Sequence, residues 1–146
     1  MKVVAKILLI NKAGQILVLR RGMTHPNFPG HLDFPGGEVD ADEEPLKAVV
    51  REVKEETGLT VNDDDVHLLF DKDNNGTRHL LYMSNMPDSS IPVKLSWEHD
   101  AHTWLSQNEL CGKKLQSNFD AYYRDVINHL TSPGRNTIER IVKGLG

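Results

Sequence analysis

The stretch GEVDADEEPLKAVVREVKEETGL, residues 37–59, contains the strongest helix signal in the chain. Pro45 suits the first turn of a helix, and Gly58 is placed to end that helix in a left-handed conformation. Four aliphatic residues recur at the spacing of one buried helix face: Leu46, Val49, Val50 and Val53. The stretch therefore predicts a helix over residues 45–57 with an apolar stripe that faces the core.

Three glutamates of this stretch, Glu52, Glu55 and Glu56, are separated by offsets of one, three and four. Offsets of three and four place residues on one helix face, where each pair of like charges costs about 0.2–0.5 kcal/mol. We expect the three carboxylates to lie away from the valine stripe, toward solvent or a cleft. A hard divalent cation such as Mg²⁺ would cancel their repulsion there. An acidic, solvated helix face is the alternative interpretation.

The whole stretch resembles the Nudix box, G-x5-E-x7-R-E-U-x-E-E-x-G-U, in which U is aliphatic. It matches at every fixed position: Gly37, Glu43, Arg51, Glu52, Val53, Glu55, Glu56, Gly58 and Leu59. The segments ILVLRR, LDFPGG and WEHDAHTWLS also resemble Nudix members related to MutT, so the resemblance covers about residues 3–130. It implies an α/β fold, the α/β/α sandwich with a mixed β-sheet, in one Nudix domain over residues 1–130. Residues 131–146 are expected to form a C-terminal tail with at most a short helix.

The resemblance also implies the metal site. In the family the glutamates of the R-E-U-x-E-E segment bind Mg²⁺ or Mn²⁺, which assigns metal binding to Glu52, Glu55 and Glu56, with help from the Gly36 carbonyl. Glu52 is the first choice for activating water, and Glu55 also belongs to the catalytic set. Arg51 is expected to orient a carboxylate through charge-assisted hydrogen bonds. Gly37, Glu43 and Gly58 are expected to fix the geometry of the loop and the helix.

Further candidates lie outside the box, each with an ordinary alternative. Glu98 stands where MutT-like members place another metal-binding or base glutamate; otherwise it is a loop carboxylate. Arg20 and Arg21 suit phosphate contact, because guanidinium matches phosphate oxygens, or they form a solvated strand end. Asn118 could read a purine edge, or cap the last helix. Phe34 of LDFPGG completes the substrate-binding set.

Whole-chain properties limit the partners. A chain of 146 residues is expected to form one domain, and its net charge of −4 gives no general attraction to nucleic acid. No apolar stretch approaches the length of a membrane span. Cys111 is the single cysteine, so no intrachain disulfide can form and a reducing cytoplasm is the expected setting. The expected partner is a small nucleotide, bound by a monomer or a homodimer.

The remaining pattern alternates strands with helices. Strands are predicted at residues 3–10 and 15–21, joined as a hairpin, and at 66–70, 77–86 and 101–106. Residues 22–37 are predicted as a loop with short strand fragments, and residues 71–76 as a turn. A second helix is predicted at 117–130, with Ser117 or Asn118 as its cap. Trp97 and Trp104 are expected in the core or in a pocket wall.

The resemblance implies Mg²⁺-dependent hydrolysis of a pyrophosphate bond in a nucleoside diphosphate derivative. The leading substrate is a nucleoside triphosphate, oxidised or unmodified, cleaved to a monophosphate and pyrophosphate. ADP-ribose hydrolases often carry a proline about fifteen residues after the box, where this chain has DKDNNGT. Dinucleoside polyphosphate hydrolases often carry a tyrosine slightly further on, and Tyr82 comes too late. These hydrolases, a nucleotide-sugar hydrolase and a non-catalytic nucleotide-binding Nudix regulator remain the alternatives.

Overall fold

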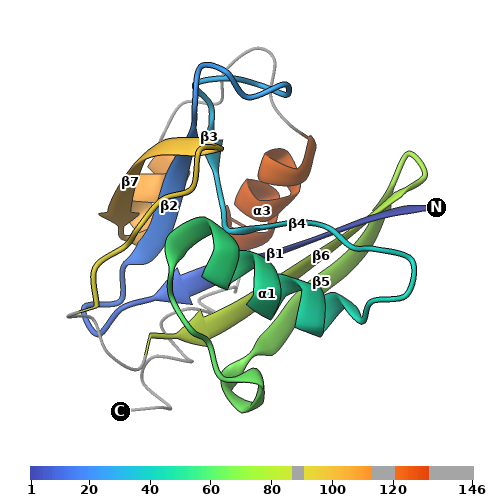
Figure 1. Cartoon of the computed structure of the whole chain (residues 1–146), viewed down its shortest axis with the longest axis horizontal. Helices are drawn as coiled ribbons and strands as arrows, with labels where there is room; N and C mark the ends of the chain where they lie inside the picture. The colour runs from blue at the N-terminus through green and yellow to red at the C-terminus, as the bar shows by residue number, and fades with distance from the viewer. Residues whose placement is uncertain (87–90, 113–120, 132–146) are drawn as a thin grey trace.

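The computed structural model describes residues 1–86, 91–112 and 121–131 (Figure 1). Its elements follow in this order: β1 (Lys2–Ile10), β2 (Ile16–Arg21), β3 (Leu32–Asp33), β4 (Gly36–Glu38), α1 (Pro45–Thr57), the 3₁₀ turn η1 (Asp63–Asp65), β5 (His67–Asn74), β6 (Thr77–Asn85), β7 (His99–Leu105), α2 (Gln107–Gly112) and α3 (Ala121–Thr131). Ser117, Asn118 and the tail from residue 132 onward lie outside the described residues.

The seven strands form one mixed sheet, in which β1 occupies the centre. The main path runs β3-β2-β1-β6-β5, while β4 pairs with β1 and β7 pairs with β2. Both strands of the predicted hairpin are present, but they separate soon after the turn, since their only register pair is Ile10 with Ile16. β1 instead runs parallel to β6 from Lys2 to Ile10. This long-range pairing is what makes the sheet mixed.

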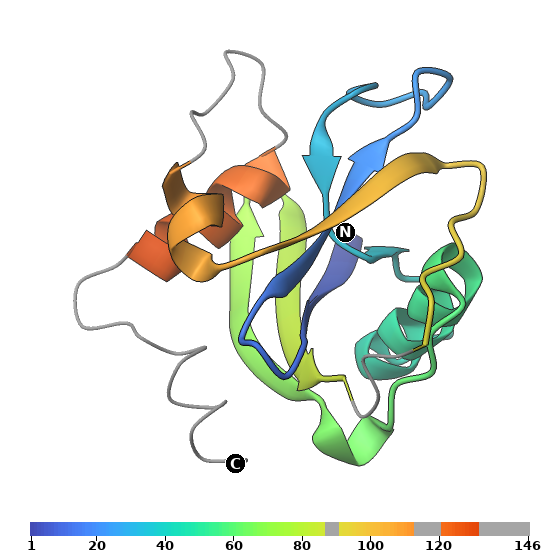
Figure 2. The ribbon, with the colours of Figure 1, turned by 90° about the vertical axis from the view of Figure 1, so that its left-hand side faces the viewer.

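Helices cover both faces of the sheet, as Figure 2 shows. On one face, Val49 and Val53 of α1 pack with Ile7 and Leu9 of β1. On the other face, residues of α2 and α3 pack with the alternate residues of β1, such as Leu8. A strand that is covered on both faces needs an almost continuous apolar run, which explains the sequence KILLI. The predicted α/β/α sandwich is confirmed.

The helix predicted from the opening stretch is present with the predicted bounds. Gly58 ends it with φ 75°, and its N–H donates to the carbonyl of Lys54 at 3.0 Å. Val49 and Val53 are buried, as expected, while Leu46 and Val50 are half-buried. None of the helices in the described ranges is long and apolar enough to cross a membrane.

Other elements differ from the predictions. β5 runs through most of the predicted 71–76 turn, which shrinks to Asn75 and Gly76, at φ 52° and 85°. These positive φ values suit a two-residue hairpin turn, for which Asn-Gly is the favoured pair. The short helix α2 was not predicted. Trp104 packs at the edge of the core, but Trp97 is 70% exposed, so its predicted burial is wrong.

Two short strands form within and at the end of the predicted 22–37 loop: β3 pairs with β2, and β4 lies against β1. β4 pairs antiparallel with β1, with Gly36 opposite Lys6. A Cβ on Gly36 would lie 2.3 Å from the carbonyl oxygen of Ala5, and Gly36 has φ 131°. Glycine is therefore required at this position by the close approach of two strands. The approach places β4 directly beside α1.

Candidate active site

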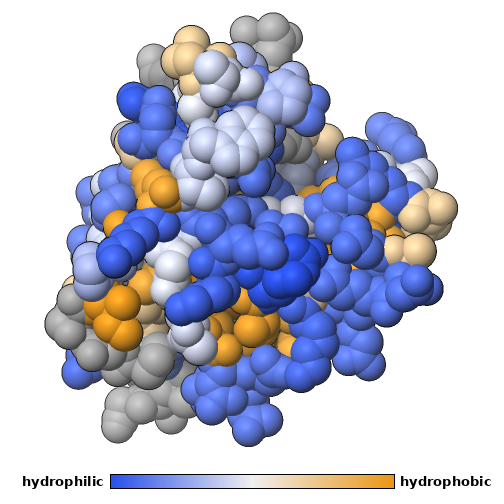
Figure 3. Space-filling model, viewed as in Figure 1, coloured by the Kyte–Doolittle hydropathy of each residue, from blue (hydrophilic) through white to orange (hydrophobic). Residues whose placement is uncertain are grey.

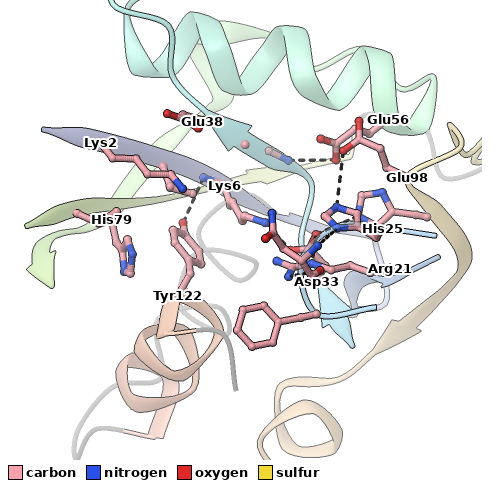
Figure 4. A pocket seen from close by; sticks show the side chains of 17 residues that line it. Lys2, Lys6, Arg21, His25, Asp33, Glu38, Glu56, His79, Glu98 and Tyr122 are labelled. Atoms are coloured by element: carbon pink, nitrogen blue, oxygen red, sulfur yellow. Dashed lines mark hydrogen bonds and ion pairs between the residues drawn. The ribbon is translucent and has the colours of Figure 1, made fainter. Parts of the chain in front are cut away.

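The residues of the candidate site gather around a polar pocket of about 390 Å³ (Figure 4). β1, β4, α1, β6 and α3 each contribute side chains to its wall, as do the loop after β2 and the start of β7. In the view of Figure 4, Glu56 and Glu98 lie at the end away from Lys2 and His79. The pocket thus has an acidic end at Glu56 and Glu98 and a mixed end, where Lys2 and His79 lie on the same side as Glu38.

Glu56 points into the pocket and is only 2% exposed. The backbone N–H of Gly36 donates to its Oε2 at 3.4 Å, and its side chain is hydrogen-bonded to that of Glu52. Burial, and then the contact with Glu52, raise the pKa of Glu56 far above the ordinary glutamate value. Two carboxyl groups held this close together are the arrangement expected where a cation binds.

The burial of Glu56 corrects the prediction that all three glutamates lie away from the core. Glu56 is seven residues after Val49 and three after Val53, so it continues the buried stripe. Glu52 is partly buried beside Gly37, where an added Cβ would lie 3.5 Å from the Glu52 carboxylate. Glu55 is exposed. The three carboxylates therefore divide between the pocket, its margin and solvent.

Arg51 holds the outer carboxylates of the box. Its Nε and Nη2 donate to both carboxylate oxygens of Glu43, at 2.8 and 3.0 Å, and its Nη1 donates to Glu55 at 3.1 Å. Nη1 also lies 3.3 Å from Oε1 of Glu52. The Arg51 hydrogen bonds hold the pKa of Glu43 below its usual range. Figure 3 shows that the surface over α1 is largely hydrophilic.

Beneath Glu56, a buried charge network surrounds Asp33. Its carboxylate accepts from Lys6 Nζ at 2.5 Å and from Arg21 Nε at 3.2 Å, and lies 2.9 Å from Nε2 of His99. Burial alone would raise the pKa of Asp33, but Lys6, the His99 hydrogen bond and Arg21 hold it well below its usual range. This network was not predicted from the sequence. Its one available signal was Lys6, a charged residue inside an otherwise buried strand, which requires a partner.

The structure separates the predicted substrate-binding residues. Arg21 lines the pocket and is 5% exposed. Arg20 points away and pairs with Asp100 at 2.7 Å on the exposed surface. Phe34 is 1% exposed and stacks on Tyr123, with ring centroids 5.6 Å apart. Phe34 therefore belongs to the core and does not reach the pocket, which corrects its predicted role.

Glu98 lines the pocket from the turn before β7, and His25 lies beside it. The backbone N–H of Asn27 donates to Nδ1 of His25 at 3.0 Å, so the neutral ring carries its proton on Nε2. Nε2 lies 3.9 Å from Oε2 of Glu98. Burial, and then Arg21, lower the pKa of His25. His25 thus presents a neutral N–H donor toward the acidic end of the pocket.

The end of the pocket opposite Glu56 and Glu98 is formed around α3, and it was not predicted from the sequence. Nδ1 of His79 lies 2.7 Å from Oδ2 of Asp125, which also accepts from Asn74 at 3.2 Å. The hydroxyl of Tyr122 accepts from the backbone N–H of Lys6 at 3.2 Å and donates to the carbonyl of Leu80. These bonds fix the wall of the pocket that faces away from α1.

The acidic end fits a hard divalent cation. Glu52 and Glu56 offer adjacent carboxylate oxygens, and Glu98 lines the same pocket. Such oxygen donors are what Mg²⁺ prefers. Glu55 is bonded to Arg51, and within residues 1–86, 91–112 and 121–131 no three acidic, histidine or cysteine side chains converge on one point. A cation would therefore start from the Glu52–Glu56 pair, and further ligands would have to turn toward it.

The fold is an α/β/α sandwich in which a glutamate-bearing helix lies beside a pocket that is also lined by Lys6 and Arg21. The chain belongs to the NUDIX domain family, which matches residues 1–130. The predicted family is confirmed.

Characterised relatives share parts of the chain. The mouse asymmetrical bis(5'-nucleosyl)-tetraphosphatase is 29% identical over 56% of this chain and 59% of its own length. The Escherichia coli CTP pyrophosphohydrolase is 30% identical over 69% of this chain and 73% of its own length. The Haemophilus influenzae 8-oxo-dGTP diphosphatase is 43% identical over 38% and 40%. The match thus spans less than two thirds of the mouse relative.

Solved structures share the fold. The MutT protein from Methanosarcina mazei superposes with a TM-score of 0.68 at 28% identity, over 88% of this chain and 91% of that one. A Caenorhabditis elegans Ap4A hydrolase superposes with a TM-score of 0.62 at 22% identity, over 97% and 98% of the two chains. The second likeness concerns the fold alone.

Proposed function

We propose that this protein hydrolyses a phosphoanhydride bond in a nucleoside diphosphate derivative, with Mg²⁺ or Mn²⁺ as the cofactor. The preferred substrate is a nucleoside triphosphate, and the products are a nucleoside monophosphate and pyrophosphate. The observation that carries the proposal is the pair formed by buried Glu56 and partly buried Glu52, beside a pocket that is also lined by Lys6 and Arg21. Carboxylates for a metal and cations for phosphate oxygens are the two requirements of phosphoryl chemistry.

Each side chain then has a role in the reaction. Glu52, Glu56 and Glu98 would hold the cation, which when bound would neutralise phosphate charge and lower the pKa of water. Glu52 is the first choice for the base, with Glu98 second. Arg51 keeps Glu52 in place from outside. Arg21 contacts a phosphate oxygen at the pocket wall, from a guanidinium that Asp33 already orients.

The size of the pocket favours one nucleotide. A volume of about 390 Å³ lies near the lower end of the usual range for small-molecule sites. The names of the related enzymes include an 8-oxo-dGTP diphosphatase and a CTP pyrophosphohydrolase, which both act on triphosphates. A nucleoside triphosphate combines one base with the anionic chain that the cations of the pocket would attract.

A dinucleoside polyphosphate hydrolase is the second candidate. The mouse and rat asymmetrical bis(5'-nucleosyl)-tetraphosphatases support it, at 29% and 30% identity. Tyr82 does not mark such a role, because it is 8% exposed and packs in the core beneath α1. A second nucleoside would have to extend from the pocket onto the surface.

A substrate screen tests the proposal. Nucleoside triphosphates, oxidised triphosphates, ADP-ribose, nucleotide sugars and diadenosine tetraphosphate are compared by kcat/KM with Mg²⁺ and with EDTA. We expect Mg²⁺-dependent cleavage and the highest kcat/KM for a triphosphate. A preference of more than about tenfold for another class, about 1.4 kcal/mol in barrier, would reject the triphosphate assignment. Binding without cleavage of any compound would identify a nucleotide-binding regulator.

The general base is tested by two matched substitutions. Glu52→Gln and Glu98→Gln each remove one carboxylate while keeping the side-chain shape. Loss of a general base lowers kcat by about 10²–10⁴-fold, so we expect the larger loss in Glu52→Gln. Activity within a few-fold of the parent in that variant would transfer the role to Glu98.

A further inference from the structure

The loop that connects β2 to β3 contributes Asn27 and Phe28 to the lining of the pocket. This loop, residues 22–31, is tied down by backbone bonds at both ends: Gly22 N–H donates to the Glu98 carbonyl and Gly30 N–H donates to the Arg21 carbonyl, each at 2.9 Å. Nη1 of Arg21 also donates to the carbonyl of Asn27 at 3.1 Å. The loop is therefore a fixed part of the pocket wall.

Phe28 is held in this loop at an unfavourable backbone conformation. Its φ is 49°, in the left-handed region that bulky side chains rarely adopt. His31 N–H closes a turn on its carbonyl at 3.2 Å. A turn alone would be served better by glycine or asparagine, and the ring gains little from burial because the residue is 38% exposed. The strain therefore points to a role for the aromatic ring itself.

The ring of Phe28 lies beside two neighbouring side chains, those of Arg21 and His31. The guanidinium carbon of Arg21 lies over it, 5.7 Å from its centroid, and the ring of His31 lies 5.4 Å away in a tilted arrangement. Phe28 nevertheless lines the pocket, so part of it stays open to a ligand. An exposed aromatic face fixed beside a buried guanidinium can stack on a planar ring.

Asn27 supplies a hydrogen-bonding group beside that ring. Its backbone is engaged on both sides, by His25 and by Arg21, while its side-chain amide bonds to no other group in the part of the chain that the structure describes. The side chain lines the pocket. An amide both donates and accepts, which suits the edge of a nucleobase.

We propose that Phe28 and Asn27 form the nucleobase-binding part of the pocket, with the base stacked on Phe28 and its edge bonded by the amide of Asn27. The inference rests on the proposed function and adds the residues that would select the base. Arg21 lies against the ring of Phe28 and also lines the pocket, so it would connect the stacked base to the phosphate chain. A nucleoside would then gain affinity that inorganic phosphate chains cannot.

Calorimetric binding to the full chain separates the base from the phosphates. The probes are α,β-methylene analogues of ATP, GTP and CTP, and tripolyphosphate, each with Mg²⁺. Phe28→Asn keeps a residue that tolerates φ 49° but removes the ring, so it is expected to melt no lower than the parent. It should bind the nucleotide analogues roughly ten- to a hundredfold more weakly, the usual effect of losing one base–aromatic stack. Its affinity for tripolyphosphate should not change.

Two further variants test the same pair of residues. Phe28→Tyr keeps a ring and should bind nucleotides as the parent does. Asn27→Ala should reduce the difference in affinity among the three bases. Met23→Ala is the matched control, because Met23 is a 74% exposed apolar residue of the same loop that does not line the pocket.

The outcomes distinguish this inference from the proposed function. Equal affinity of Phe28→Asn and the parent for nucleotides would overturn the stacking role. So would a parallel loss of nucleotide and tripolyphosphate binding, which would mean that the loop had moved. A parent that binds tripolyphosphate as tightly as nucleotides overturns the base site and leaves phosphoanhydride chemistry intact. A parent that binds neither overturns both.

Discussion

At the scale of single residues, Asp33 shows how a buried charge depends on its partners. It lies 6% exposed among Lys6, Arg21 and His99. Removing one member of such a network leaves the others charged and unpaired in the interior. Asp33→Asn should therefore lower the free energy of unfolding by about 3–5 kcal/mol, measured by urea denaturation.

Asp100→Asn is the control for that measurement, since it breaks the exposed ion pair with Arg20. Its urea midpoint should stay within experimental error of the parent, because exposed pairs contribute little to stability. Equal losses in the two variants would mean that the buried network is no more important for folding than a surface contact.

Glu56 gives the metal-free protein a distinct pH dependence. Burial and Glu52 raise its native pKa above the ordinary value of 4.5. Between pH 4.5 and the raised native pKa, Glu56 is protonated in the native state and ionised in the unfolded state. The native state then binds more protons, so stability should fall as pH rises. Glu56→Gln is neutral at every pH. In EDTA it should therefore melt higher than the parent at about pH 8, with the difference disappearing near pH 4.

The control for this pH dependence is Glu55→Gln, which changes an exposed carboxylate of the same helix. It should retain the parent's dependence of melting temperature on pH, whatever its absolute stability. Parallel pH curves for the parent and Glu56→Gln would show that Glu56 is ionised in the native protein at neutral pH.

At the scale of elements, the pairing of β4 with β1 depends on Gly36. An alanine there adds a contact of 2.3 Å with the Ala5 carbonyl to a φ of 131°. Gly36→Ala should therefore cost roughly 3 kcal/mol or more in unfolding free energy. Gly76→Ala is the matched comparison, since φ is 85° and an added Cβ meets nothing within 4 Å. It should cost only about 1–2 kcal/mol.

Equal costs at Gly36 and Gly76 would mean that β4 can shift away from β1 without loss. In that case the position of the loop beside α1 would not depend on this close approach. Denaturant titration of both variants gives the comparison directly.

Signals within a short stretch of sequence were sufficient to predict elements, such as α1, whose bounds are set by that stretch alone. Pro45, the valine spacing and Gly58 were sufficient for α1, and its bounds agree with the prediction. β5 was predicted too short, because its second half is the polar sequence DKDN. That half is held by pairing with β6, including an ion pair of Asp71 with Arg78 at 2.6 Å. Nothing local to residues 71–74 shows this pairing.

The sequence indicated most of the candidate site residues within one motif, while Arg21 and Glu98, predicted from outside it, also line the pocket. Glu52, Glu55, Glu56 and Arg51 follow from the box, although the buried position of Glu56 required the helix period to be carried one step past Val53. Asp33 is 27 residues from Lys6 and 66 from His99, so the network exists only once the sheet has formed. The pocket wall formed by α3 depends equally on the tertiary fold.

At the scale of the whole molecule, the candidate metal site links distant parts of the chain. Glu52 and Glu56 come from α1, Gly36 comes from β4, and Glu98 precedes β7. These groups come into the same region only in the folded protein, so a cation that binds there is bound by the native state alone. Its binding free energy then adds to the stability of the entire domain.

Mg²⁺ should therefore raise the melting temperature of the parent. At about one hundred times its Kd a native-state ligand adds about 2.7 kcal/mol, or roughly 5–10 °C for a chain of this size. The rise should be larger at about pH 8 than at about pH 6, because the cation must displace the proton held by Glu56.

Glu55→Gln combined with Glu56→Gln should abolish the rise and leave the metal-free protein folded. Asp64→Asn, in the exposed acidic turn η1, should respond to Mg²⁺ as the parent does. An undiminished rise in the double variant would place the cation elsewhere, and a double variant that unfolds in EDTA would make these glutamates structural.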